Sequence, residues 1–197
     1  MSQFLCNFAM VETVLAHIHD IEIEHRSAFA NRIKHMQRLG YPTGINTGRG
    51  IAATYKAHHL FLLGLTLELA QVGLATDSAI PLLKENSDSI RSALQRALRH
   101  RNNMDFDPVF LAFDPAKLSP LMKRDCRGPQ SIRGKITYGG QGVLGKLAKE
   151  RRCVIIALTK LLTQIGAQLA TFDSDEEEQF YDGLRIWMDA PEEEEAS

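Results

Sequence analysis

Apolar residues recur every three or four positions in five segments of the first 103 residues, and this spacing constrains the fold more than any other feature. An α-helix turns once every 3.6 residues, so the spacing places the apolar side chains of each segment on one helical face. Ser27 is a candidate cap for the second segment, and Gly40 and Pro42 end it. The predicted helices cover residues 11–21, 28–39, 55–73, 78–86 and 87–103.

The stretch RLGYPTGINTGRGIAATY, residues 38–55, separates the second predicted helix from the third. Its glycines, its proline and Asn46 are typical of a loop, yet it carries Arg38 and Arg49. A linker, a phosphate-cradling loop and a small hairpin that contacts a partner all fit this composition. A P-loop does not, because the stretch lacks the Gly-Lys-Ser/Thr ending and no apolar strand precedes it.

The pattern changes after Met104. Two short strands are predicted, at residues 109–113 and around 136–138, and a long helix is predicted over residues 143–172. The apolar stripe of this helix either packs on its own domain or forms the seam between two subunits of a dimer. The residues of this candidate dimerisation stripe are Leu147, Val154, Leu158, Leu161, Ile165 and Leu169.

Charge divides the chain into a basic body and an acidic tail. Residues 1–172 contain 22 Lys and Arg against 13 Asp and Glu, a net charge of +9, whereas residues 173–197 carry a net charge of −10. Such a division is typical of nucleic-acid-binding proteins, although an acidic tail that only keeps a basic domain soluble fits equally well. We expect an N-terminal domain at 1–103, a dimerisation or partner domain at 104–172, and a partly disordered tail whose apolar centre docks as a short helix.

Several other chemistries are not favoured by the sequence. No apolar run is long enough to span a membrane and the first residues lack a basic start, so we expect a soluble cytoplasmic protein. Three dispersed cysteines argue against a disulfide framework or a zinc ribbon. No catalytic arrangement is apparent, so we expect neither an enzyme nor a metal or cofactor. The residues weighed for such roles, and interpreted as surface, turn or core residues, are His17, His19, His58, His59, Asp105, Asp107, Asp114, Cys6, Cys126 and Cys153.

Two gap-free blocks resemble the MerR family of transcription regulators. The second helix of that family reads TLRYYERLGL, and residues 32–41 here read RIKHMQRLGY. The segment that follows the family's wing matches residues 55–83 through Tyr55, Gly73 and the pair Leu82 and Leu83. The chain departs from the family at Ala53, where Arg is common, and in the EIEHR sequence that lengthens the connection between the first two helices.

The resemblance, which covers roughly residues 32–86, implies an N-terminal winged helix-turn-helix. Together with the pattern after Met104, we expect a mainly α protein in which this module is followed by an α+β segment with two short strands and a long helix. The resemblance also implies a dimeric, sequence-specific DNA-binding regulator that reads double-stranded DNA with helix 28–39 and wing 42–55. A protein–protein adaptor and a ligand-sensing switch in the C-terminal half are the alternatives, with the transcription machinery or a small molecule as partner. The residues expected to contact DNA are Arg26, Ser27, Asn31, Arg32, Lys34, His35, Arg38, Thr43, Asn46, Thr47, Arg49, Tyr55 and Lys56.

Overall fold

A computed structural model describes residues 3–45, 52–99, 107–115, 134–147 and 152–190 of the chain. Contacts within the chain divide it into two units, one formed by residues 1–67 and 161–197 and the other by residues 68–160. The division falls inside two helices, whereas the sequence suggested boundaries near residues 103 and 172. Among the described residues, no helix is long and apolar enough to cross a membrane.

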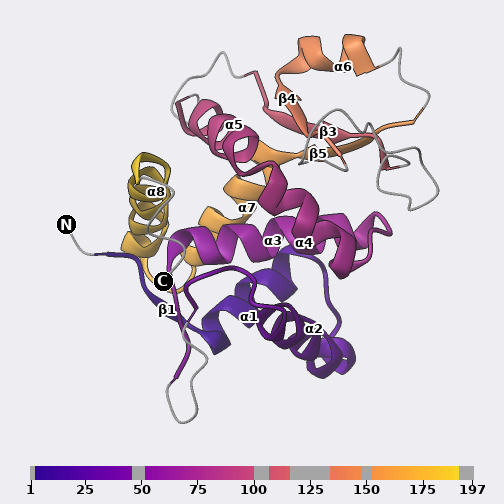
Figure 1. Ribbon diagram of the computed structural model, residues 1–197. Coiled ribbons are helices and arrows are strands. Elements are labelled where there is room, and N and C mark those ends of the chain that lie inside the picture. Colours follow the sequence, from indigo (N-terminus) through magenta and orange to yellow (C-terminus); the bar gives the residue numbers. More distant parts are fainter. Residues whose placement is uncertain (1–2, 46–51, 100–106, 116–133, 148–151, 191–197) are drawn as a thin grey trace. The chain divides into compact units, whose positions relative to one another are not determined.

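The described residues are mainly helical, with eight α-helices, a short 3-10 helix and five short strands (Figure 1). The helices are α1 (Phe8–Ile18), η1 (Ile23–His25, 3-10), α2 (Arg26–Arg38), α3 (Ala57–Gln71), α4 (Thr76–Glu85), α5 (Ser87–Arg99), α6 (Gln141–Leu147), α7 (Leu158–Leu169) and α8 (Ser174–Asp189). The strands are β1 (Cys6–Asn7), β2 (Thr54–Tyr55), β3 (Phe110–Phe113), β4 (Thr137–Gly139) and β5 (Val154–Ala157). The five helices predicted in the first half and the strands predicted near 109–113 and 136–138 are therefore confirmed.

The first unit is built around α3. Gly64 lies on the face of α3 that meets α1 and α7, and an added Cβ there would be 3.3 Å from Leu15 and 3.5 Å from Ile165. The missing side chain therefore lets the three helices approach closely, as close packing of a core requires. The chain before α1 forms β1, which pairs antiparallel with β2, so that Cys6 lies opposite Tyr55.

Helix α8 belongs to the core of the same unit. Asp173 caps its start by accepting a hydrogen bond from the Asp175 N–H at 3.0 Å, and the acidic residues of its first turn favour the positive end of the helix dipole. The apolar centre of the tail does form a helix, but this helix already begins at Ser174 and is longer than expected. Its buried side chains are Phe180, Tyr181, Leu184 and Trp187.

The second unit packs α5 on a three-stranded antiparallel sheet with the order β4-β3-β5. Asn86, which lies between α4 and α5 and is 5% exposed, connects these helices to the segment that leads into β4. Its amide donates to the Gly134 carbonyl at 2.9 Å, and its oxygen accepts from the Ile136 N–H at 2.9 Å. Asp107 accepts from the Gln141 N–H at 2.8 Å and pairs with Arg96, so its role is structural, although it makes more than the turn expected from the sequence.

The long helix predicted over residues 143–172 is wrong. Val154–Ala157 forms strand β5, which pairs with β3, and the helix on its C-terminal side begins only at Leu158. Val154, Ile155 and Ile156 are β-branched, which favours a strand, and pairing with β3 gives hydrogen-bond partners to the backbone groups on one edge of β5. The apolar spacing continued across this strand by coincidence and suggested a single helix.

The stripe proposed as a dimer seam is buried inside the single chain. Leu158, Leu161, Ile165 and Leu169 are between 0% and 2% exposed. Val154 lies in a strand instead, and the side chain of Leu147 lies outside the described part of the structure. A dimer remains a prediction, but those four leucine and isoleucine side chains are not available to a partner in this fold.

The start of α2 also differs from the expected one. Ser27 lies inside the first turn of α2 rather than at its cap, because the 3-10 helix η1 runs directly into the helix. His25 occupies the cap position and makes no capping side-chain hydrogen bond. The residues that lengthen the connection between the first two helices therefore fold as a helical turn.

Candidate nucleic-acid interface

Helix α2 has one buried face and one polar face. Phe29, Ile33 and Met36 are buried, at most 6% exposed. The residues spaced by three and four positions on the opposite side are all exposed, and helical periodicity brings them together in one row. This row, which we call the α2 surface, consists of Ser27, Asn31, Lys34, His35 and Arg38.

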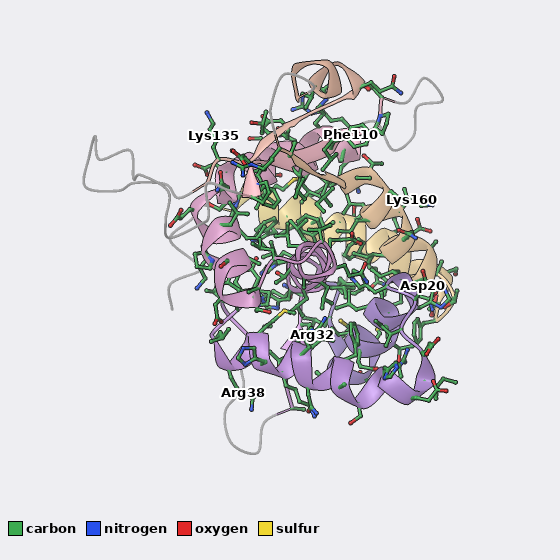
Figure 2. All side chains as sticks on the ribbon, turned by 90° about the vertical axis from the view of Figure 1, so that its right-hand side faces the viewer. Asp20, Arg32, Arg38, Phe110, Lys135 and Lys160 are labelled. Carbon is green, nitrogen blue, oxygen red and sulfur yellow. The ribbon has the colours of Figure 1, made fainter. Side chains whose placement is uncertain are left out.

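Arg32 is also exposed but lies at the flank of this surface, because it is three positions after Phe29 and four before Met36, both of which are buried. Figure 2 shows Arg32 and Arg38 on α2, with Arg38 in the last turn of the helix. The Lys34 ammonium lies 5.2 Å from the centre of the Phe8 ring, a cation–π contact that limits the positions of this flexible side chain. The polar face thus carries three exposed cations over less than two helical turns.

The charge around the α2 surface is entirely positive in the sequence. Between Glu24 and Glu68 the chain contains six Lys and Arg and no Asp or Glu. The first unit as a whole carries a net charge of −8, with its acidic residues before Arg26 and after Phe172, whereas residues 68–160 carry a net charge of +7. The positive charge of α2 is therefore a local property of this surface and not of the unit that contains it.

Arg26 differs from the other cations of α2. Its guanidinium approaches the Glu12 carboxylate at 2.8 Å and 3.2 Å, which ties the start of α2 to α1. Both side chains are mostly buried, with 32% and 16% of their surface exposed. A bidentate pair of this kind fixes geometry, so the structure gives Arg26 a role in positioning α2.

A buried histidine holds both ends of the loop that follows α2. His59, 2% exposed, accepts a hydrogen bond at Nδ1 from the Lys56 N–H at 3.1 Å. Its other ring nitrogen bonds the backbone of Thr43, a contact that stabilises the protonated nitrogen. The two bonds assign a neutral imidazole with the proton on Nε2. His59 therefore fixes the chain where it leaves α2 and where it enters α3.

The pKa of the His59 imidazole is lowered from 6.5 to about 4, mainly because the ring is buried. The hydrogen bond to the Thr43 backbone partly opposes this change, and the nearby Lys56 charge adds a smaller contribution in the lowering direction. The ring of His58 packs edge-on at 4.1 Å between centroids. His59 is therefore neutral at physiological pH, and its acceptor nitrogen stays available to Lys56.

Two further contacts fix the end of the loop. The Gln37 side-chain amide of α2 donates a hydrogen bond to the Tyr55 hydroxyl. Strand β2, which contains Tyr55, pairs with β1. Burial raises the pKa of the Tyr55 hydroxyl, and the side chain is 0% exposed, so Tyr55 supports the loop from inside the core.

The structure therefore brings together part of the predicted contact set. Ser27, Asn31, Lys34, His35 and Arg38 form the α2 surface, with the exposed Arg32 at its flank. Thr43 is half-buried and Lys56 is exposed at the two ends of the loop, whereas Asn46, Thr47 and Arg49 lie outside the described residues. The sequence did not reveal the positioning roles of Gln37 and His59, because each role depends on a partner distant in sequence, Tyr55 for Gln37 and Thr43 for His59.

Both histidine pairs, His17 with His19 and His58 with His59, lie within the described residues. No group of three or more His, Cys, Asp or Glu side chains that could hold a metal occurs within the ranges the structure describes. His19 and His59 are buried, at 6% and 2%, so their interpretation as surface residues is wrong. His19 packs against Phe29 with ring centroids 6.4 Å apart, which makes it part of the contact between α1 and α2.

An open pocket of about 220 Å³ lies between the end of α1 and α7. It is separate in sequence from α2 and the loop. Its lining includes no residue of the predicted contact set. The residues around it are His17, Ile18, Asp20, Gln164, Ala167 and Gln168.

Comparison with models of known protein families gives no match, and comparison with curated proteins finds no significant relative. The features that bear on function are therefore the α2 surface, the loop ends that follow it, and the charges of both.

Proposed function

We propose that the chain is a sequence-specific DNA-binding regulator that reads duplex DNA with the α2 surface and the loop that follows it. The proposal includes a winged helix-turn-helix similar to that of the MerR family, with residues 42–55 as the wing. The observation that carries it is the segregation of charge: the chain between Glu24 and Glu68 is cationic throughout and displays Asn31, Lys34 and Arg38 on one exposed helical face.

The residue types of the α2 surface suit both kinds of DNA contact. Lys34 and Arg38, which lie one helical turn apart, are suited to neutralise neighbouring phosphates. Asn31 lies one turn before Lys34 on the same row, and an Asn amide can pair with the N6 and N7 edge of adenine. Arg32 at the flank supplies either a phosphate contact or a bidentate contact to guanine.

The fixed loop ends explain how a glycine-rich segment could contribute to binding. A loop that must be ordered on binding loses conformational entropy, and fixing its ends beforehand reduces that cost. His59 and the pair of Gln37 and Tyr55 supply this constraint next to the last turn of α2. Lys56 at the end of the loop is suited to a phosphate contact, and we propose the same for Thr43, Asn46, Thr47 and Arg49.

A dimer is part of the proposal, because one such module covers a short half-site and two-fold proteins gain affinity by reading two. The seam must involve surfaces other than the buried stripe of α7. Light scattering on the purified chain tests the dimer directly, and a monomer at micromolar concentration would remove this part of the proposal.

The central experiment measures binding to duplex DNA over a range of salt concentrations. The variant R32A/K34A/R38A removes three exposed cations from α2, and the control R99A/K135A/R152A removes three exposed cations from the other unit. For the α2 variant, the slope of log K against log salt should fall by about 0.9 for each lost phosphate contact. The variant N31A should lose roughly 1–3 kcal/mol of discrimination at one base pair of a site selected from random sequences.

Two results would refute the proposal. One is that the parent chain retains no duplex from the random pool at 50 mM salt. The other is that the α2 variant and its control bind equally well. Binding to acidic proteins but not to duplex DNA would favour the adaptor alternative, in which the same surface contacts an acidic partner.

A further inference from the structure

The pocket between the end of α1 and α7 has an aspartate where its backbone favours glycine. Helix α1 ends in a Schellman motif, in which the Ile21 N–H donates to the Ala16 carbonyl at 2.9 Å. The second hydrogen bond of the motif joins the Asp20 N–H to the His17 carbonyl at 3.1 Å. The left-handed position of such a motif is usually glycine, and sometimes asparagine, because most side chains are strained there. Here it is Asp20, with a φ of 52°.

Asp20 is unfavourable for folding in a second respect. The carbonyl groups at the end of a helix carry a partial negative charge, so a carboxylate is repelled there. The side chain of Asp20 is exposed, and within the described part of the chain no hydrogen bond or ion pair offsets this repulsion. Glycine or asparagine would end the helix equally well without the charge. The fold alone therefore gives no reason for a carboxylate at this position.

A second helix end contributes negative potential to the same pocket. Besides the end of α1, the lining comes from the last two turns of α7, which ends at Leu169. The helices have 11 and 12 residues, so both are long enough to carry a substantial dipole. The C-terminal ends of two helices and one carboxylate therefore surround the pocket, all within the first unit.

Two glutamine side chains of α7 supply neutral acceptors. Gln164 and Gln168 are one helical turn apart, half-buried, and both line the pocket. The Gln168 amide nitrogen donates to the Thr171 hydroxyl at 3.4 Å, so the oxygen of this amide remains available to a ligand. Ile18 and Ala167 form the apolar part of the lining. The pocket thus combines one carboxylate, two amide oxygens and a short apolar wall.

This combination favours an organic cation over an anion or a metal ion. An anion would be repelled by Asp20 and by both helix ends. A hard metal ion such as Ca²⁺ takes about six to eight oxygen ligands, whereas the pocket offers a single carboxylate. An ammonium or guanidinium group carries several donors and no acceptor, and His17, exposed in the same lining, adds an acceptor when its imidazole is neutral. The volume of about 220 Å³ is below the roughly 300–1,000 Å³ of pockets for drug-sized molecules, so the ligand is small.

We propose that this pocket binds a small organic cation, a primary ammonium or guanidinium group on a short carbon chain. The cationic group lies against the Asp20 carboxylate and donates hydrogen bonds to the amide oxygens of Gln164 and Gln168. The carbon chain packs on Ile18 and Ala167. The bound charge offsets the repulsion between Asp20 and the end of α1, which accounts for the carboxylate. The site does not depend on the α2 surface or on the proposed DNA-binding function.

A titration of the whole chain with cadaverine and with agmatine, followed by ¹H–¹⁵N NMR at constant ionic strength, tests the site. Cadaverine supplies ammonium groups, and agmatine supplies a guanidinium group as well. The backbone amide of Asp20 and the side-chain amides of Gln164 and Gln168 should move and saturate. Pentanediol, which has the carbon chain of cadaverine without its charge, is the matched control and should move none of them.

Variants at Asp20 separate ligand binding from a structural role. Asp20→Asn and Asp20→Gly should weaken binding of either cation roughly three- to ten-fold, as expected for a charged contact in an open site. Both should also raise the Tm of the free chain by roughly 2–4 °C, because they relieve the repulsion or the backbone strain. Glu24→Gln removes an exposed carboxylate of η1 outside the pocket and should change neither quantity. A residue that only supports the fold would instead lower the Tm when replaced.

A gain of binding completes the test. Gln164→Glu adds a second carboxylate to the pocket and should tighten cation binding by a similar factor, whatever the Asp20 variants do to the fold. The proposal is overturned if these resonances do not move, if pentanediol moves them equally, or if neither Asp20→Asn nor Gln164→Glu changes the affinity. Lysine and arginine blocked at both backbone ends carry the same groups on a peptide. Tighter binding of these than of the free cations would assign the pocket to a side chain of a protein partner and overturn the small ligand.

Discussion

Protonation of His59 should destabilise the first unit below neutral pH, and this prediction tests the loop anchor independently of any partner. The folded chain holds the pKa of His59 at about 4, below the ordinary value of 6.5, because burial disfavours the charged ring. The unfolded chain therefore binds the proton more readily than the folded chain. Stability contributed by neutral His59 is complete above pH 6.5 and decreases as pH falls through 6.5 towards 4.

The size of the effect follows from the two pKa values. A change from 6.5 to about 4 corresponds to roughly 3 kcal/mol of unfolding free energy between the neutral and the fully protonated limits. At pH 5 about 2 kcal/mol of this should already be lost relative to pH 8. This is a substantial part of the stability of an ordinary domain. Burial raises the pKa of Glu68 and of Glu176, which acts in the opposite direction, because their contribution falls as pH rises.

Because these carboxyl groups also contribute to the pH dependence of stability, the difference between parent and variant isolates His59. The variant His59→Gln keeps a donor for Thr43, and His59→Asn keeps an acceptor for Lys56. Each should lose roughly 1–3 kcal/mol at pH 8, since one buried backbone partner is left unsatisfied. Each should also lose the part of the pH dependence that the parent shows between pH 5 and 6.5.

The assay is urea unfolding from pH 5 to 8, followed by the fluorescence of Trp187. Trp187 is the single tryptophan of the chain, and it stacks on His58, which contacts His59. The exposed His35 gives the control, because replacing it with Gln should leave the pH curve of the parent unchanged. Parallel pH curves for parent and His59→Gln would refute the assignment of His59 as a neutral, doubly bonded anchor.

Three shorter predictions concern other parts of the core. Tyr181→Phe removes a buried hydroxyl that donates to the Leu162 carbonyl at 3.1 Å, and urea unfolding should show a loss of about 0.5–1.5 kcal/mol. Gly140→Ala places a Cβ against the Asp107 carboxylate, and thermal unfolding should show a loss of about 1–3 kcal/mol, with no loss meaning that the carboxylate moves freely. Burial raises the pKa of the Cys6 thiol to about 12, so mass spectrometry should find Cys6 alkylated only after unfolding, and rapid labelling of the folded chain would contradict its burial.

Most helices of the first half were predictable because they bury one face along their length, whereas α3 was recognisable as a long apolar segment that is buried on nearly all sides. In α5, for example, Ile90, Leu94 and Leu98 recur every four positions and are all buried. This periodicity is local, so it can be recognised without knowledge of the neighbouring elements. The same is true of β3, a short apolar segment between proline-containing turns.

Elements that depend on distant partners could not be predicted in the same way. Strand β5 continues the apolar spacing of α7, and only its pairing with β3 shows that it is extended. The pairing of β1 with β2 joins residues 47 and 49 positions apart through two residues on each side, which is too short a pattern to recognise. The anchor at His59 likewise depends on two backbone groups that the fold brings to one ring.

The acidic C-terminal residues cannot be treated as one tail, and this changes how their role must be tested. Removal of everything after Phe172 would take Phe180, Tyr181 and Leu184 out of the core, where each is at most 1% exposed. Any change in DNA binding by such a truncated chain would then reflect lost folding as much as lost charge. Cutting after Ala190 removes the four glutamates Glu192–Glu195 and leaves the buried residues of α8 in place, so it separates the electrostatic role of these glutamates from the structural role of the helix. The two groups of acidic residues also differ in their effect on α8. Those in its first turn interact favourably with the positive end of the helix dipole, whereas Glu192–Glu195 follow the opposite end and cannot have this role.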